Sequence, residues 1–183
     1  MSGPRRPRAA LVALVTVSAL VGCGSTGDQA TASAIRGNAS AAWATAQLID
    51  VDGQRFTIKD LAGKPVVVEN FATWCSNCLR QLGDTQKAAV AAGDSAVFLA
   101  LSVETDIALA DVAAYADKHG FGNIRFAVMT PEFLAATKDA FGTAALNPSS
   151  TPKIVVTSGG KPGKVVTGFE TPEKIAARIT TAG

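Results

Sequence analysis

Two cysteines, Cys75 and Cys78, lie close together in this 183-residue sequence, at a spacing suited to reversible disulfide chemistry. Thiols at positions i and i+3 can meet in the first turn of a helix, where unpaired backbone N–H groups and the positive end of the helix dipole stabilise a thiolate. We therefore expect the pKa of Cys75 to fall below the free value of about 8.5, which makes this thiol a nucleophile near neutral pH. Cys78, deeper in the helix, would resolve the mixed disulfide that Cys75 forms.

Other uses of the cysteine pair fit the sequence less well. Haem attachment requires a histidine after the second cysteine, where this sequence has Leu79. A zinc site requires four ligands, and beyond the pair the chain offers one histidine, His119, and one further cysteine, Cys23. A structural disulfide remains an alternative, although a bridge this short closes almost no loop and stabilises little. We therefore predict no metal site and no cofactor, and we interpret His119 as a helix C-terminal contact.

The residues around the pair predict an α/β domain with a central mixed β-sheet between helices. The β-branched run 66–71 is typical of a strand buried on both faces. The helix that follows should span 76–92 and end at Gly93, and Asp52-Gly53 marks an N-terminal β-hairpin. The other predicted elements are strands at 47–51, 55–58 and 96–103, helices opened by Asp106 (to His119), Thr130-Pro131 and Thr171-Pro172, and a hairpin of 154–156 with 164–166.

The segment 63–78, Gly-Lys-Pro-Val-Val-Val-Glu-Asn-Phe-Ala-Thr-Trp-Cys-Ser-Asn-Cys, resembles the TlpA/ResA-like branch of thioredoxin-like proteins. The resemblance extends over about residues 43–182 and implies a thioredoxin-like fold with dithiol–disulfide exchange. It implies that Cys75 and Cys78 are the redox-active disulfide and that Trp74 is the aromatic residue that shields it.

The resemblance also implies a substrate-binding loop. Thr151-Pro152 matches the Thr-Pro that precedes the penultimate strand of the family. In that fold the proline follows a cis peptide bond, and its loop offers backbone groups to an extended substrate beside the attacking sulfur. We therefore expect Thr151 and Pro152 to bind substrate and Pro152 to be cis.

Glu69 precedes Cys75 by six residues, where the resembling fold carries a buried acid beneath the second cysteine. A carboxylate in an apolar strand costs free energy unless it is paired or protonated. We expect burial to raise the pKa of Glu69, so that it accepts the proton of Cys78 as that thiol attacks. Related proteins often have a second glutamate after the pair, but this chain has Gln81, which cannot titrate. The alternative is that Glu69 is a peripheral carboxylate.

The N-terminus resembles a bacterial lipoprotein signal peptide. Three arginines precede an apolar run at 9–21, which at about 1.5 Å per residue is too short to cross a bilayer core of roughly 30 Å. The run ends just before Cys23, which we predict to be lipidated. The predicted organisation is a signal peptide at 1–22, a flexible tether at 23–42 and a thioredoxin-like domain at 43–183.

These features together predict an extracytoplasmic, lipid-anchored thiol–disulfide oxidoreductase at the cell membrane. We expect it to reduce disulfides of exported proteins with electrons from a membrane donor; cytochrome c maturation is one client process of the resembling branch. A disulfide-donating oxidase and a non-enzymatic copper-handling lipoprotein are the alternatives. Three of the 17 basic residues precede the apolar run and the rest nearly balance the 15 acidic ones, so no basic patch points to nucleic acid.

Overall fold

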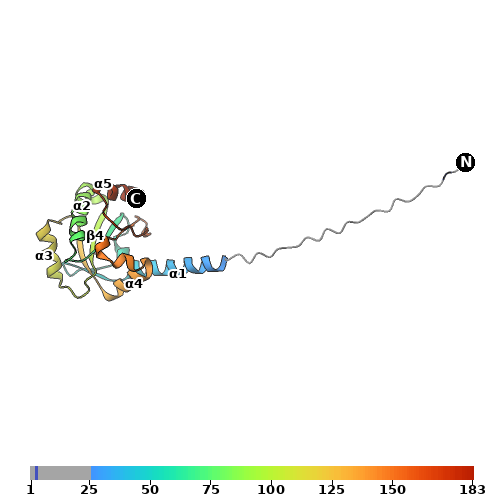
Figure 1. Cartoon of the computed structure of the whole chain (residues 1–183), viewed down its shortest axis with the longest axis horizontal. Coiled ribbons are helices and arrows are strands. Elements are labelled where there is room, and N and C mark those ends of the chain that lie inside the picture. The colour runs from blue at the N-terminus through green and yellow to red at the C-terminus, as the bar shows by residue number, and fades with distance from the viewer. Residues whose placement is uncertain (1–2, 4–25) are drawn as a thin grey trace.

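The computed structural model of the chain describes residue 3 and residues 26–183 (Figure 1). Cys23 and, apart from residue 3, the predicted signal peptide lie outside the described residues. Within the described part, no helix has both the length and the hydropathy needed to cross a bilayer.

The described residues form five α-helices and a sheet of six strands. The helices are α1 (Thr26–Thr45), α2 (Ser76–Ala92), α3 (Leu109–His119), α4 (Pro131–Phe141) and α5 (Pro172–Ala182). The strands are β1 (Leu48–Asp50), β2 (Arg55–Phe56), β3 (Val66–Phe71), β4 (Val97–Ser102), β5 (Arg125–Met129) and β6 (Lys153–Val156).

The sheet is mixed, with the strand order β2-β1-β5-β4-β3-β6. Strands β3, β4 and β5 run parallel at its centre, whereas β1 and β6 pair with them antiparallel. Every residue of β3 is buried, as expected for a β-branched strand covered on both faces. The predicted N-terminal hairpin is confirmed, and β1 joins it to the sheet by pairing with β5.

Helices cover both faces of this sheet, which confirms the predicted α/β architecture. Along β3 the side chains alternate: Val67 and Phe71 pack under α2, α3 and α5, whereas Val66 and Val68 pack under α1 and α4. On the first face, α2 and α5 lie side by side (Figure 1). By the same alternation, Glu69 faces α2, the helix that begins at the cysteine pair.

Three helices follow their sequence signals closely. Helix α2 has the predicted bounds, and Gly93 ends it with a positive φ of 52°. Thr130 and Thr171 cap α4 and α5: each hydroxyl accepts a backbone N–H from the first turn, and a proline follows at the first helical position. Local side-chain chemistry therefore determines where these helices begin.

The predicted flexible tether differs from the structure, because residues 26–45 form helix α1. This segment is rich in alanine, the residue with the highest helix propensity. Near its end, Trp43 is buried and packs against Phe133 and Phe141 of α4. Figure 1 shows the first turns of α1 extending away from the sheet and the other helices.

Three further elements differ from the prediction. Strand β5 was not predicted, although it lies between β4 and β1 and connects the hairpin to the parallel strands. Helix α3 begins after Ala108, and Asp106 lies in the preceding turn. The second strand of the predicted C-terminal hairpin is reduced to two isolated bridges, one of them at Pro162, which has no N–H to continue a ladder.

Candidate active site

The two cysteines lie at the start of α2 and form a disulfide. Cys75 is the N-cap residue, and its sulfur accepts a hydrogen bond from the backbone N–H of Cys78 at 3.1 Å. The two Cα atoms are 5.2 Å apart, within the usual range for a disulfide. The Cys75 sulfur therefore lies at the positive end of the α2 dipole, where reduction leaves a stabilised thiolate.

A groove of about 640 Å³ opens beside the disulfide, and Cys75 lines it whereas Cys78 does not. Cys75 is 4% exposed and Cys78 is 0% exposed. Of the two sulfurs, that of Cys75 therefore borders the groove, while the roles of attacking and resolving thiol stay predictions. Trp74 also lines the groove, and with 67% of its surface exposed it borders the approach to the pair rather than covering it.

Helix α3 forms the other side of this groove through Tyr115 and His119, among others. Their rings lie 4.8 Å apart in an edge-on arrangement. Burial raises the pKa of Tyr115 to about 12, so its hydroxyl stays neutral. The sequence did not indicate that either residue belongs to the site. Helix α3 packs against strand β5, and because that strand was not predicted, the position of α3 relative to α2 could not be inferred.

The loop that ends at Pro152 lies against the start of α2. The Cys78 sulfur is 3.1 Å from the carbonyl oxygen of Pro148, so the reduced thiol can donate to that oxygen. The side-chain amide of Asn77 donates to the carbonyl oxygen of Ser149 at 3.0 Å. These contacts place the predicted substrate-binding loop beside the redox pair.

The predicted cis bond before Pro152 is wrong, because no peptide bond among the described residues is cis. The chain turns instead through Thr151, which adopts a left-handed conformation with φ 47° and ψ 59°. Its backbone N–H donates to the carbonyl oxygen of Pro148 at 2.8 Å. A left-handed residue is uncommon for a β-branched side chain, and here it makes the reversal for which a cis bond was expected.

Glu69 is 1% exposed and faces α2 from β3. Its Oε2 accepts a hydrogen bond from the Thr85 hydroxyl at 2.6 Å, while Oε1 has no hydrogen-bond partner among the described residues. Burial raises the pKa of Glu69 to about 7, and the Thr85 hydrogen bond and the charge of Lys153 both oppose that rise. Glu69 therefore has the burial and the raised pKa that the sequence predicts, while its catalytic role stays a prediction.

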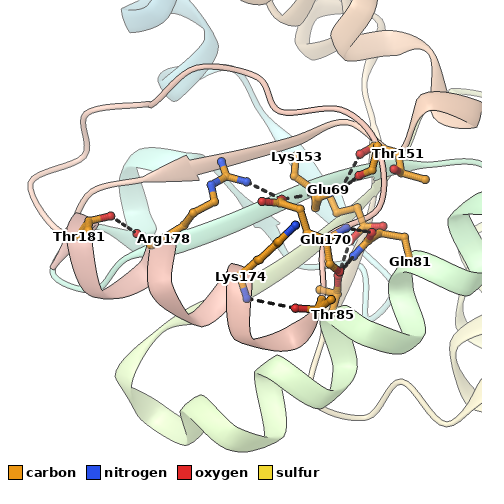
Figure 2. A network of polar contacts seen from close by, with 11 residues as sticks. Glu69, Gln81, Thr85, Thr151, Lys153, Glu170, Lys174, Arg178 and Thr181 are labelled. Atoms are coloured by element: carbon orange, nitrogen blue, oxygen red, sulfur yellow. Dashed lines mark hydrogen bonds and ion pairs between the residues drawn. The ribbon is translucent and has the colours of Figure 1, made fainter.

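Glu69 belongs to a buried polar network between α2, β6 and the segment before α5 (Figure 2). Gln81 joins α2 to Glu170: its Nε2 donates to the Glu170 carbonyl oxygen at 3.0 Å, and its Oε1 accepts the Glu170 N–H at 2.8 Å. Lys153 pairs with Glu69 across β3 and β6 and is fully buried. Sequence reasoning missed Lys153, although a lysine that opens an apolar run was a signal.

Comparison with known proteins places this geometry in a family. The protein-family model described as Redoxin matches residues 26–174. No curated protein matches the chain in a sequence comparison.

Several solved structures share the fold. A thiol:disulfide interchange protein of the thioredoxin family from Chlorobium tepidum TLS has 22% identity and a TM-score of 0.63, over 75% of this chain and 92% of that one. The pneumococcal exposed lipoprotein thioredoxin Etrx1 from Streptococcus pneumoniae strain TIGR4 has 26% identity and a TM-score of 0.59, over 74% and 98%. Copper-bound ScoI from Arabidopsis thaliana has 16% identity and a TM-score of 0.59, over 74% and 94%.

The family model covers β3, the cysteine pair and most of the network around Glu69. The solved structures share the overall fold of this chain. The chain therefore belongs to the Redoxin family and has the fold of the thioredoxin-like thiol–disulfide oxidoreductases.

Proposed function

We propose that this chain reduces disulfides of exported proteins through its cysteine pair. The observation that carries the proposal is a disulfide at the start of α2 of which one member, Cys75, borders an open groove while the other, Cys78, is buried. That arrangement separates the thiol that meets a substrate from the thiol that resolves the intermediate.

The proposed reaction has two exchanges. In the first, the Cys75 thiolate attacks one sulfur of a client disulfide, and the other client sulfur leaves as a thiolate. In the second, the Cys78 thiolate attacks the Cys75 sulfur, the bond to the client breaks, and the second client thiolate leaves. The client gains two electrons and becomes a dithiol, and the chain returns to the disulfide form.

Glu69 is the proposed proton acceptor for the second exchange. Cys78 must lose its proton to attack, and the buried surroundings offer it little water. Glu69 lies on the face of β3 that α2 covers, and its pKa of about 7 allows it to take up a proton at neutral pH. This position on β3 supports Glu69 as the proton acceptor.

Regeneration requires a dithiol donor, which we propose to be a membrane protein. A lipid on Cys23 would keep the domain near such a donor on the extracytoplasmic face, and α1 would hold the domain off the lipid surface at about 1.5 Å per residue of helix. One structural neighbour is described as an exposed lipoprotein thioredoxin, which supports this arrangement.

Copper handling is the second candidate, because the neighbour ScoI is described with copper bound. Cys75 and His119 line the same groove, and thiolate and imidazole both suit copper. Among the described residues, no three His, Cys, Asp or Glu side chains lie close enough together to hold a metal ion. Copper titration of reduced wild type and His119→Ala tests this candidate: binding that depends on His119 supports it, and no binding removes it.

Trapping of mixed disulfides tests the proposed reductase. Cys78→Ser should accumulate client proteins linked through Cys75, because the resolving thiol is missing. Cys75→Ser should trap few clients, since its remaining thiol is buried. The double variant is the control for background. Equal trapping by the two single variants would contradict the assigned roles.

The direction of electron flow needs a separate measurement. A reduction potential near that of thioredoxin, about −270 mV, supports a reductase, whereas a value near that of DsbA, about −120 mV, supports the disulfide-donating alternative.

A further inference from the structure

Lys153 is the first residue of β6, directly after the loop that borders the disulfide, and its exposure is 0%. An ammonium group almost never loses all contact with water unless its charge is balanced and its donors are used. Its partners therefore indicate what it does for the fold and for the site.

The Lys153 ammonium group makes two short hydrogen bonds to backbone carbonyls. It donates to the carbonyl oxygen of Thr151 at 2.7 Å and to that of Gly168 at 2.8 Å. The first carbonyl belongs to the loop beside the redox pair, so Lys153 holds the end of this loop against the segment that leads to α5 (Figure 2).

Three charged side chains act on Lys153: Glu69, Glu170 and Arg178. Glu170 Oε2 lies 2.7 Å from Arg178 of α5 and 3.9 Å from Lys153, so Arg178 is its nearer cation. Glu69 lies opposite Lys153 in the antiparallel pairing of β3 and β6, where the two side chains share a face of the sheet. Lys153 is therefore the cation available to Glu69.

The other ionisable groups that act on Glu69 do not supply a positive charge. Asp84 of α2 and Glu170 are carboxylates and oppose its ionisation. Tyr115 of α3 stays neutral because burial raises its pKa. Arg178 acts on Lys153 and bonds to Glu170.

We propose that Lys153 is a positioning residue of the redox site, which places a positive charge opposite Glu69 across β3 and β6 and fixes the Thr151 end of the substrate-binding loop. The proposal rests on the disulfide-reductase function proposed above and adds a residue to it. One side chain thereby links the proton acceptor under α2 to the loop that receives the client.

The charge balance gives the expected consequence. With Glu69 ionised, two carboxylates face two cations in the network, and protonation of Glu69 leaves one positive charge in excess. Lys153 thus favours the ionised form that accepts the Cys78 proton. Without Lys153, the Thr85 hydrogen bond alone opposes the effect of burial on the Glu69 pKa, and Glu69 should hold its proton to higher pH.

Lys153→Met tests the inference, because methionine keeps the length of the side chain and removes the charge. In the reduced protein with ¹³C-labelled glutamate, the Glu69 carboxyl resonance, identified by its absence in Glu69→Gln, reports the titration directly. Its midpoint should move up by about one pH unit or more, the size expected for loss of a nearby opposite charge. The rising limb of the pH profile for the rate of disulfide reduction should move to higher pH together with this midpoint.

Three further variants separate the loss of charge from other effects of the substitution. Lys153→Gln keeps a hydrogen-bond donor for the carbonyls but lacks the charge, so it should show the same shift and serves if Lys153→Met does not fold. Lys164→Met makes the same chemical change at an exposed position and should leave the midpoint unchanged. In a Glu69→Gln background, Lys153→Gln should no longer move the pH profile.

An unchanged Glu69 midpoint in a folded Lys153 variant overturns the inference, as does a pH-profile shift that persists in the Glu69→Gln background. The titration needs no client, so it remains decisive if wild type proves unable to reduce disulfides. Reduction that proceeds normally with an unchanged midpoint would refute the role of Lys153 alone.

Discussion

Replacement of Glu69 by glutamine should make the unfolding free energy less dependent on pH. The substitution keeps the shape of the side chain and its capacity to accept from Thr85, whose hydroxyl lies 2.6 Å from Oε2. It removes the one ionisable group of β3, a fully buried interior strand between β4 and β6. The oxidised protein is the form to measure, because its disulfide removes the thiols from the titration.

The expected magnitude follows from the raised pKa. Glu69 titrates at about 7 in the folded protein, against an ordinary value of 4.5. Between these values the folded state keeps a proton that the unfolded chain has released, so stability falls as pH rises through the window and is level above it. A shift of one pKa unit corresponds to about 1.4 kcal/mol of unfolding free energy. Glu69 should therefore lower the unfolding free energy of wild type by about 2.5 kcal/mol between about pH 5 and pH 8.

Urea unfolding at several pH values provides the assay. The stability of Glu69→Gln relative to wild type should rise by about 2.5 kcal/mol from about pH 5 to about pH 8. Glu132→Gln, at an exposed position of α4, is the matched control and should show no such trend. A constant difference between wild type and Glu69→Gln across this range would refute the argument from burial.

Turnover should respond in the opposite sense to stability. Loss of the proton acceptor should slow disulfide reduction by about tenfold to a hundredfold, the low end of general-base contributions, and should remove one transition from the pH profile. Wild-type turnover in Glu69→Gln across the same pH range would assign proton transfer to water instead.

The remaining predictions concern the hydrogen-bond partner of Glu69 and the N-terminus. Thr85→Val removes the hydrogen bond that lowers the pKa of Glu69, so the rising limb of turnover should move to higher pH; an unmoved limb would contradict this. The same variant should lose about 1–3 kcal/mol of unfolding free energy at about pH 8, where Glu69 is ionised. Cys23→Ala should move the protein from the membrane fraction to soluble or unprocessed forms in cell fractionation, and unchanged attachment with normal processing would rule out lipidation at Cys23.

Much of the site could be predicted because its signals are local. The thiols lie within one helical turn, and the same few residues determine the N-cap geometry of Cys75. Glu69 could be identified because a carboxylate in a β-branched run must be either paired or protonated. The start and end of α2 depend on side-chain and glycine chemistry that is readable from neighbouring residues.

The rest could not be predicted because it depends on contacts between distant segments. Lys153 lies opposite Glu69 only because of the register between β3 and β6, and most of the domain's sequence separates these two strands. Strand β5 is a short apolar segment, and its function of connecting the hairpin to the parallel strands is visible only from its position between β4 and β1. The left-handed backbone of Thr151 before Pro152 was not indicated by the pair of residue types.

The glutamine at position 81 shows why Glu69 is the candidate proton acceptor in this chain. The Gln81 amide donates to the Glu170 carbonyl and accepts the Glu170 N–H, a pairing that requires both a donor and an acceptor. An ionised glutamate there could accept but not donate, and its charge would face the Glu170 carbonyl. It would also bring a third carboxylate beside Glu69 and Glu170, which have only two cations in the network. The amide is therefore the side chain that fits this position, and it leaves Glu69 of β3 as the carboxylate of the network that faces α2.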